Sequence, residues 1–237
     1  MRTKGDSMIH RRDFLGTLVA TGAVGLASMT PFRLNAMQDK EMQGQGMSSA
    51  SPSGFEDWLK KINAKHRQVF DSPHHVGGLP LAWTRVFLMT GGSGEKVQAG
   101  GSNSDVQAVL VLRHASIPLA MKSDLWKKYN FTKVFEIQNP ETKKPITENV
   151  FWQPKQGSLP VPGMGIDELM KDGALIGVCD MAIMVYSQAV AKKMNLKPED
   201  VKKEWEEGVL PGIQIVPSGV LAVNRAQEHG CTYCFAG

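Results

Sequence analysis

Cys179 occupies the position in this sequence that is best suited to nucleophilic chemistry. It ends the aliphatic run ALIGVC, directly before a helical pattern. Helix N–H groups and the helix dipole stabilise a thiolate at such a position. Asp180 opposes this effect, because a neighbouring carboxylate disfavours a second negative charge. The alternative is a buried cysteine that packs as a small apolar side chain.

Arg113 and His114 end another aliphatic run, AVLVLRH. In parallel sheets, ligand sites lie outside the carboxyl ends of the strands. We therefore expect Arg113 and His114 to assist Cys179 in the candidate site. The alternative for His114 is a strand-end histidine whose hydrogen bonds are satisfied within the fold.

Cys231 and Cys234 form a Cys-x-x-Cys pair in the last seven residues. Dithiol oxidoreductases place this motif after a strand and before a helix, whereas here it follows a helical pattern. Phe235 replaces the histidine that covalent haem attachment requires. In an extended strand the two Cα atoms lie about 10 Å apart, beyond the roughly 7 Å limit of a disulfide. The pair is predicted to be secondary thiols or, in a tight turn, a disulfide.

Neither a metal nor a cofactor is predicted from the sequence. A four-ligand zinc site needs two ligands besides the cysteine pair, and His74-His75 is the only histidine cluster. The stretch GGSGEK lacks the Gly-Lys-Ser/Thr ending of a phosphate loop, which favours a flexible connector.

Residues 1–36 match a twin-arginine export signal. Arg11-Arg12 precedes Phe14-Leu15 and a weakly apolar run without charge. A membrane anchor is the alternative, although the uncharged run from Gly16 to Phe32 is short and rich in Gly and Thr. We expect a periplasmic or exported protein that contacts a membrane only through an uncleaved signal.

The charge of the remaining chain argues against nucleic acid as a partner. Residues 1–36 hold five Lys or Arg and two Asp or Glu, so three of the four formal positive charges lie there. The nearly neutral remainder has no basic stripe for a phosphate backbone.

A flexible tether at residues 37–53 and a single domain at residues 54–237 are predicted, because the tether is polar and poor in aliphatic residues. Strands and helices alternate through the domain, which predicts an α/β fold with a small parallel sheet of flavodoxin or Rossmann type and helices on both faces. Residues 139–165 contain five prolines and are predicted to be an insertion that covers the site.

The strands that would form this sheet are HRQVFDSP, DVQAVLVLRH, ALIGVC, GIQIVPSG and CTYCF. The predicted helices run from Ser53 to about Ala64 and through PLAWTRVFLMTG, SIPLAMKSDLWKKYN, GIDELMKDG, DMAIMVYSQAVAKKMN, KPEDVKKEWEEG and SGVLAVNRAQEHG. The second of these is apolar on all sides and predicted to be buried, with a strand as the alternative. Asp180 and Ser218 are the predicted caps of the helices that they open.

The last third of the chain resembles the DsrE/DsrF family of sulfur-relay proteins. The resemblance runs from Gly165 to Gly230 and rests on GALIGVCDMAI, LKPEDV and LPGIQIVPSGVLAVNRAQEHG. It implies a small α/β fold, a homo-oligomer, and persulfide sulfur on the cysteine that ends the third strand, which is Cys179 here.

The resemblance implies a carrier of sulfane sulfur, similar to a sulfurtransferase, with a sulfur donor or acceptor protein as its partner, and the predicted twin-arginine signal makes it an exported one. Two alternatives stay open. The first is a non-catalytic periplasmic module that binds a ligand or assists assembly, with Cys179 packed in its core. The second is a thiol redox sensor.

Overall fold

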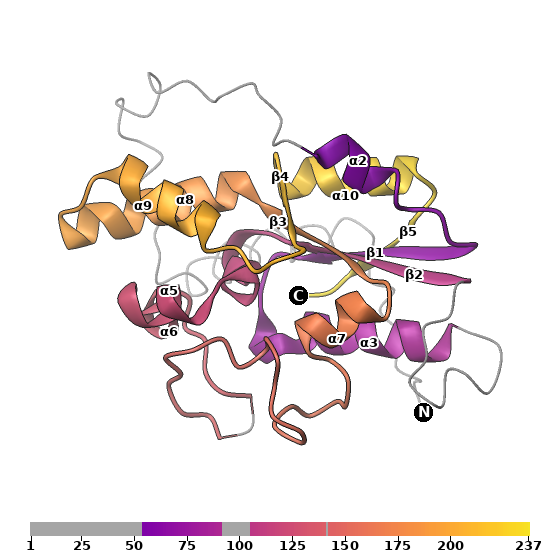
Figure 1. Cartoon of the computed structure of the whole chain (residues 1–237), viewed down its shortest axis with the longest axis horizontal. Helices are drawn as coiled ribbons and strands as arrows, with labels where there is room; N and C mark the ends of the chain where they lie inside the picture. The colour runs from indigo at the N-terminus through magenta and orange to yellow at the C-terminus, as the bar shows by residue number, and fades with distance from the viewer. Residues whose placement is uncertain (1–53, 92–104, 141) are drawn as a thin grey trace, which may run out of the picture. The chain divides into compact units, whose positions relative to one another are not determined.

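Five parallel strands form one sheet in the part of the chain that the computed structural model describes, residues 54–91, 105–140 and 142–237. These residues belong to one compact unit, residues 48–237. The strand order is β4-β3-β2-β1-β5 (Figure 1). The strands are β1 (His66–Ser72), β2 (Val106–Leu112), β3 (Leu175–Cys179), β4 (Gln214–Val216) and β5 (Thr232–Phe235). The predicted α/β class and parallel sheet are confirmed.

Helices connect consecutive strands, as parallel pairing requires. The connecting helices are α3 (Leu79–Thr90), α5 (Ser123–Lys128), α6 (Phe131–Val134), α7 (Ile166–Lys171), α8 (Asp180–Met194), α9 (Pro198–Glu207) and α10 (Gly219–Glu228), and α2 (Phe55–Leu59) precedes β1. Two short 3-10 helices, η3 (Val76–Gly78) and η4 (His114–Ala120), precede α3 and α5.

Helices cover both faces of the sheet, as predicted. Figure 1 shows α2 and α10 on one side and α3 and α7 on the other. Each side has its own apolar cluster. Val69 and Val109 pack with α2 and α10, whereas Phe70 and Leu110 pack with α3, α7 and α8. This alternation along β1 and β2 follows from the two-residue period of a strand.

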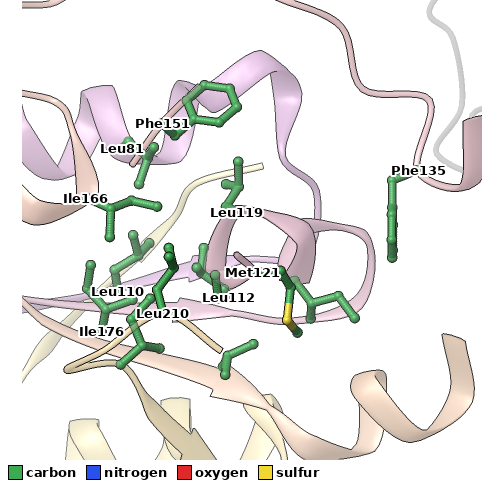
Figure 2. Close-up of a cluster of buried hydrophobic side chains, with 14 of the residues drawn as sticks. Leu81, Leu110, Leu112, Leu119, Met121, Phe135, Phe151, Ile166, Ile176 and Leu210 are labelled. Atoms are coloured by element: carbon green, nitrogen blue, oxygen red, sulfur yellow. The ribbon is translucent and has the colours of Figure 1, made fainter. Parts of the chain in front are cut away.

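The larger cluster holds the middle strands against the helices (Figure 2). Leu110, Leu112 and Ile176 of the strands are at most 1% exposed, as are Leu81 of α3 and Ile166 of α7. Burying one such side chain stabilises the fold by about 1.5–3 kcal/mol. The strand ends that carry the candidate site therefore rest on a rigid base.

The surface of α3 differs from the prediction of a helix buried on all sides. Leu81 and Leu88 face the core, while Leu79, Trp83 and Val86 are exposed, Trp83 by 46%. Only one stripe of a helix can meet a sheet, so a sequence that is apolar all round leaves its outer residues at the surface.

Two predicted helices have different bounds in the structure. The first ends at Leu59, short of Ala64. The helix predicted across residues 116–130 is divided into η4, α5 and α6. Met121 and Lys122 are extended and Asn130 is left-handed, which interrupts the helical ladder at both divisions.

The proline-rich segment packs against η4 and α7. The side-chain amide of Asn149 donates to the carbonyls of Leu119 and Met121, both at 2.8 Å. The backbone N–H of Gln153 donates to Asp167 at 3.0 Å. These bonds tie the segment to η4 and the residue after it and to α7, and none of its described hydrogen bonds reaches Cys179.

The twin-arginine segment, the tether and the glycine-rich stretch after Gly91 lie outside the described residues. Across residues 54–91, 105–140 and 142–237, none of the helices combines the length and the apolar character needed to span a bilayer.

Candidate functional site

Cys179 lies where β3 passes directly into α8. It is the last residue of the strand and the N-cap of the helix, with an extended backbone. Its Sγ accepts a hydrogen bond from the backbone N–H of Ala182 at 3.3 Å. The prediction that Asp180 caps this helix is wrong, because Asp180 is already the first helical residue and the Cys179 sulfur takes the capping position.

The N-terminus of a second helix also points at this sulfur. The backbone N–H groups of Gly219 and Met181, together with that of Ala182, lower the pKa of the Cys179 thiol. Gly219 opens α10, whose N-cap is Ser218 as predicted. Since α8 and α10 pack on opposite faces of the sheet, Cys179 lies between β3 and β4 where the connections change sides. Ligand sites of open α/β sheets form at such switch points.

Arg113 directly follows β2, the strand adjacent to β3, at the position next to Cys179. Leu112 of β2 pairs with Val178 of β3, so the residues that follow them leave the sheet together. Arg113 interacts electrostatically with the thiol of Cys179. The Arg113 side chain also lies against the backbone of Gly219, where an added Cβ would come within 2.5 Å of the Arg113 Cβ. The structure thus brings Arg113 and Cys179 to the same edge of the sheet.

The guanidinium of Arg113 is held by Asp71 at the end of β1. Nε donates to Oδ1 at 2.6 Å and Nη2 donates to Oδ2 at 2.9 Å. The hydroxyl of Tyr233, on the edge strand β5, donates to Asp71 Oδ2 at 3.1 Å. The hydrogen bonds to Asp71 raise the pKa of Arg113 above its ordinary value. Asp71 and Tyr233 therefore fix the guanidinium of Arg113, which interacts electrostatically with Cys179.

The thiol of Cys179 is deeply placed, since the residue is 6% exposed. Burial raises its pKa above the ordinary value, and the charge of Asp180 adds to this effect. The three backbone N–H groups act in the opposite direction and lower the pKa, but burial is the largest effect. The resting form near neutral pH is the thiol.

Asp180 is partly neutralised by a lysine of α9. Lys202 Nζ lies 3.0 Å from Asp180 Oδ1 and also pairs with Glu206. Lys202 therefore links Asp180, the carboxylate next to Cys179, to Glu206 of α9.

The His114 ring packs against two other aromatic rings. It stacks edge-on with His74 at 5.4 Å and with Tyr186 at 5.6 Å between ring centroids. The Tyr186 hydroxyl is 3.3 Å from its Nδ1. Burial lowers the pKa of His114, and the charges of His74 and Arg113 lower it further. His114 is therefore adjacent to the site through Arg113, while its described contacts are with His74 and Tyr186.

Cys231 and Cys234 are free thiols on opposite faces of β5. Cys231 is buried with α2 and α10, and burial raises its pKa to about 11. Cys234 packs on the side of Phe70, and burial raises its pKa as well. The predicted terminal strand is confirmed, and its extended backbone separates the two sulfurs.

The adjacent histidines do not act as one cluster. His74 stacks on His114, whereas His75 Nε2 lies 2.9 Å from the carbonyl of Phe135. The residues that the structure describes contain no group of three or more His, Cys, Asp or Glu side chains that could hold a metal ion.

The sequence reasoning did not identify Asp71, Tyr233 or Gly219. Asp71 ends a predicted strand as Arg113 and Cys179 do, so the rule of carboxyl strand ends would have found it. Tyr233 and Gly219 act through a hydroxyl and a backbone N–H, whose placement depends on the order of strands in the sheet.

No protein-family model, no curated protein and no solved structure matches this chain.

Proposed function

We propose that this chain is an exported protein of the DsrE/DsrF type that binds or transfers sulfane sulfur as a persulfide on Cys179. One observation carries the proposal: the Cys179 sulfur accepts a hydrogen bond from the first turn of α8, and the N–H of Gly219 at the start of α10 lowers the pKa of the same thiol. Helix N-termini stabilise negative charge, and a thiolate and its persulfide are both anions.

The reaction begins with the Cys179 thiolate. It attacks the terminal sulfur of a donor persulfide, R–S–S⁻, forming a new S–S bond. The S–S bond of the donor breaks, and R–S⁻ leaves with the electron pair. In the second half, an acceptor thiolate attacks the outer sulfur of Cys179–S–S⁻, which releases the Cys179 thiolate and gives the acceptor persulfide. No external oxidant or reductant is consumed.

Arg113 is the better supported of the two assisting residues. It interacts electrostatically with Cys179 and is fixed by Asp71. A fixed cation beside the sulfur favours both anionic forms over the neutral thiol. His114 follows Arg113 at the same strand end, and its described contacts are with His74 and Tyr186.

The buried position of Cys179 defines the size of donor that can load it. A side chain that is only 6% exposed reacts with small species such as polysulfide more readily than with a folded partner. Because burial keeps the resting sulfur protonated, the proton must leave to solvent before attack.

The test is loading of the full-length, reduced protein with inorganic polysulfide, followed by removal of excess reagent and reaction with cyanide. Cyanide takes the outer sulfur of a persulfide as thiocyanate and returns the thiolate. We expect one thiocyanate per chain from the wild type and none from Cys179→Ser. Cys234→Ser is the control, because Cys234 is the more accessible thiol. Equal thiocyanate from Cys179→Ser and the wild type contradicts the proposal.

A second candidate function is favoured by the burial of Cys179. In a non-catalytic module for ligand binding or assembly, this thiol is core packing and its raised pKa keeps it inert. That function predicts that Cys179 resists alkylation in the native protein and reacts only after unfolding. In a thiol redox sensor, Cys179 oxidises and is reduced again without carrying sulfur.

Export and assembly belong to the proposal through the N-terminal signal and the family resemblance. The protein reaches the periplasm or the exterior folded, forms a homo-oligomer, and meets a donor or acceptor protein there. Fractionation of cells that express the wild type or a chain with lysines in place of Arg11 and Arg12 tests export. Sedimentation of the exported form tests its assembly.

A further inference from the structure

Asp71, Arg113 and Tyr233 form a chain of contacts that ends at Cys179. Asp71 is 5% exposed, and both of its oxygens accept bonds from the Arg113 fork. Tyr233 adds a third bond to the same carboxylate. A two-pronged pair of this kind fixes the plane of a guanidinium as well as its distance.

Arg113 is confined on its other sides too. The backbone of Gly219 lies against its Cβ, Cγ and Cδ atoms, and β2 pairs with β3 up to the residue before Cys179. Without the Asp71 fork, the end of this long side chain would lose two of the bonds that hold it at the sheet edge and could turn toward solvent. The position of the Arg113 guanidinium therefore depends on the Asp71 carboxylate.

Tyr233 connects the C-terminal strand to this arrangement. β5 lies next to β1, and Phe235 pairs with Asp71 in the register of the two strands. Cys231 and Cys234, on either side of Tyr233 in the sequence, pack on opposite faces of the sheet. Pairing with β1 keeps β5 extended, and the Tyr233 hydroxyl bonds to Asp71 across these two strands.

We propose that Asp71 is a positioning residue, which together with Tyr233 holds the Arg113 guanidinium beside Cys179 and so stabilises the sulfur anion there. This inference rests on the proposed function for its purpose, since the anion is the thiolate or the persulfide of the sulfur carrier. It also gives the Cys-Thr-Tyr-Cys segment a role: its tyrosine completes the site from the edge of the sheet.

Several other groups act on Cys179 and must be counted. Asp180 opposes the anion from α8, and Lys202 of α9 pairs with Asp180. Asp71 itself carries a negative charge, so its direct effect on a thiolate opposes its effect through Arg113. These two effects have opposite signs, which makes the inference testable.

The experiment measures the pH dependence of Cys179 alkylation in the full chain, resolved by peptide mass spectrometry. We expect Asp71→Asn to raise the apparent pKa of Cys179 and to slow alkylation at pH 7 about 3- to 10-fold, as loss of a neighbouring cation does. Tyr233→Phe shifts the profile in the same direction by less. Asp71→Glu restores part of the loss, because it keeps the carboxylate.

A double-mutant cycle with Arg113→Gln separates positioning from a direct charge effect. If Asp71 acts through Arg113, Asp71→Asn has little further effect in the Arg113→Gln background. An apparent pKa that falls or stays constant in Asp71→Asn overturns the inference. If circular dichroism shows that Asp71→Asn does not fold, Tyr233→Phe decides the question. Tyr233 is 48% exposed and the change removes only a hydroxyl, so this variant should keep the fold.

Alkylation requires no sulfur donor, so the two proposals fail separately. If the variants shift the alkylation profile as predicted but the wild type takes up no sulfur, the sulfur-carrier function is contradicted and the positioning role of Asp71 stands. A protein that loads sulfur on Cys179 with the same alkylation profile in wild type and Asp71→Asn contradicts the positioning alone.

Discussion

The backbone N–H of Gly219, the first residue of α10, acts on the sulfur of Cys179, the last residue of β3, and lowers the pKa of that thiol. This interaction links two connections that run on opposite faces of the sheet. The same glycine lies against Arg113. Gly219 is therefore the point at which the cation, the second helix and the candidate nucleophile meet.

Replacement of Gly219 by alanine should disturb both stability and the site. The new Cβ would lie 2.5 Å from the Arg113 Cβ, so α10 or Arg113 must move. We expect a loss of about 1–3 kcal/mol in the free energy of unfolding and slower alkylation of Cys179. Urea unfolding and peptide-resolved alkylation measure the two effects.

The control for Gly219→Ala is Val220→Ala at the next position. Val220 is 71% exposed, so its loss should change stability by no more than about 0.5 kcal/mol. Equal behaviour of the two variants would show that the close approach of Arg113 to Gly219 does not constrain the site.

Asp180→Asn should make Cys179 more reactive. The Asp180 carboxylate raises the pKa of the Cys179 thiol, so its removal lowers that pKa and increases the thiolate fraction below it. We expect alkylation at pH 7 to be about two- to fivefold faster, as a Coulomb effect of about 0.4–1 kcal/mol gives. Asp124→Asn, in the exposed first turn of α5, should leave the rate unchanged. A slower rate in Asp180→Asn would mean that the carboxylate serves the site in another way.

Cys231 should make the stability of the reduced protein decrease at alkaline pH. Burial raises its pKa to about 11, above its value in the unfolded chain. Its contribution to stability is therefore complete below about pH 8.5. That contribution is lost as the pH rises through about 11. Urea unfolding across this range should show a shallower decline for Cys231→Ala than for the wild type, and parallel declines would contradict the assignment.

Trp205 should be a principal anchor of α9, which carries Lys202. Its side chain is fully buried, and its ring lies 4.7 Å from that of Phe131. Trp205→Ala is expected to cost about 3–5 kcal/mol, because it removes a large core side chain. Trp83→Ala, at a position that is 46% exposed, should cost far less. Thermal unfolding of both variants makes the comparison, and similar losses would contradict the packing described.

Much of the fold follows from local patterns in the sequence. Aliphatic runs such as VQAVLVL predict buried strands, and Ser218 predicts the start of α10 correctly. The same patterns fail at residues 116–130, where the left-handed backbone of Asn130 divides a helix that the side chains alone favour. Tertiary packing decides where such a helix is interrupted, and the hydrophobic periodicity of the sequence carries no information about that packing.

The candidate site could be predicted in part for the same reason. Cys179 and Arg113 each end a strand, so the sequence alone places them at one edge of a parallel sheet. The contact of Tyr233 with Asp71 requires that β5 lie beside β1 in the sheet. The order of the strands along the sequence does not reveal this arrangement. The rotation of His114 toward Tyr186 depends on a left-handed backbone at His114, which few residues other than glycine adopt.

Mass spectrometry of the native protein tests the central claim most directly. The full chain is exposed to polysulfide, alkylated and digested, and the peptide with Cys179 is compared between the wild type and a Cys179→Ser control. The account predicts a mass gain of one sulfur atom on the Cys179 peptide of the wild type, with no gain in the corresponding peptide of the control. A native Cys179 that neither gains sulfur nor alkylates would contradict it and show that this cysteine is part of the core.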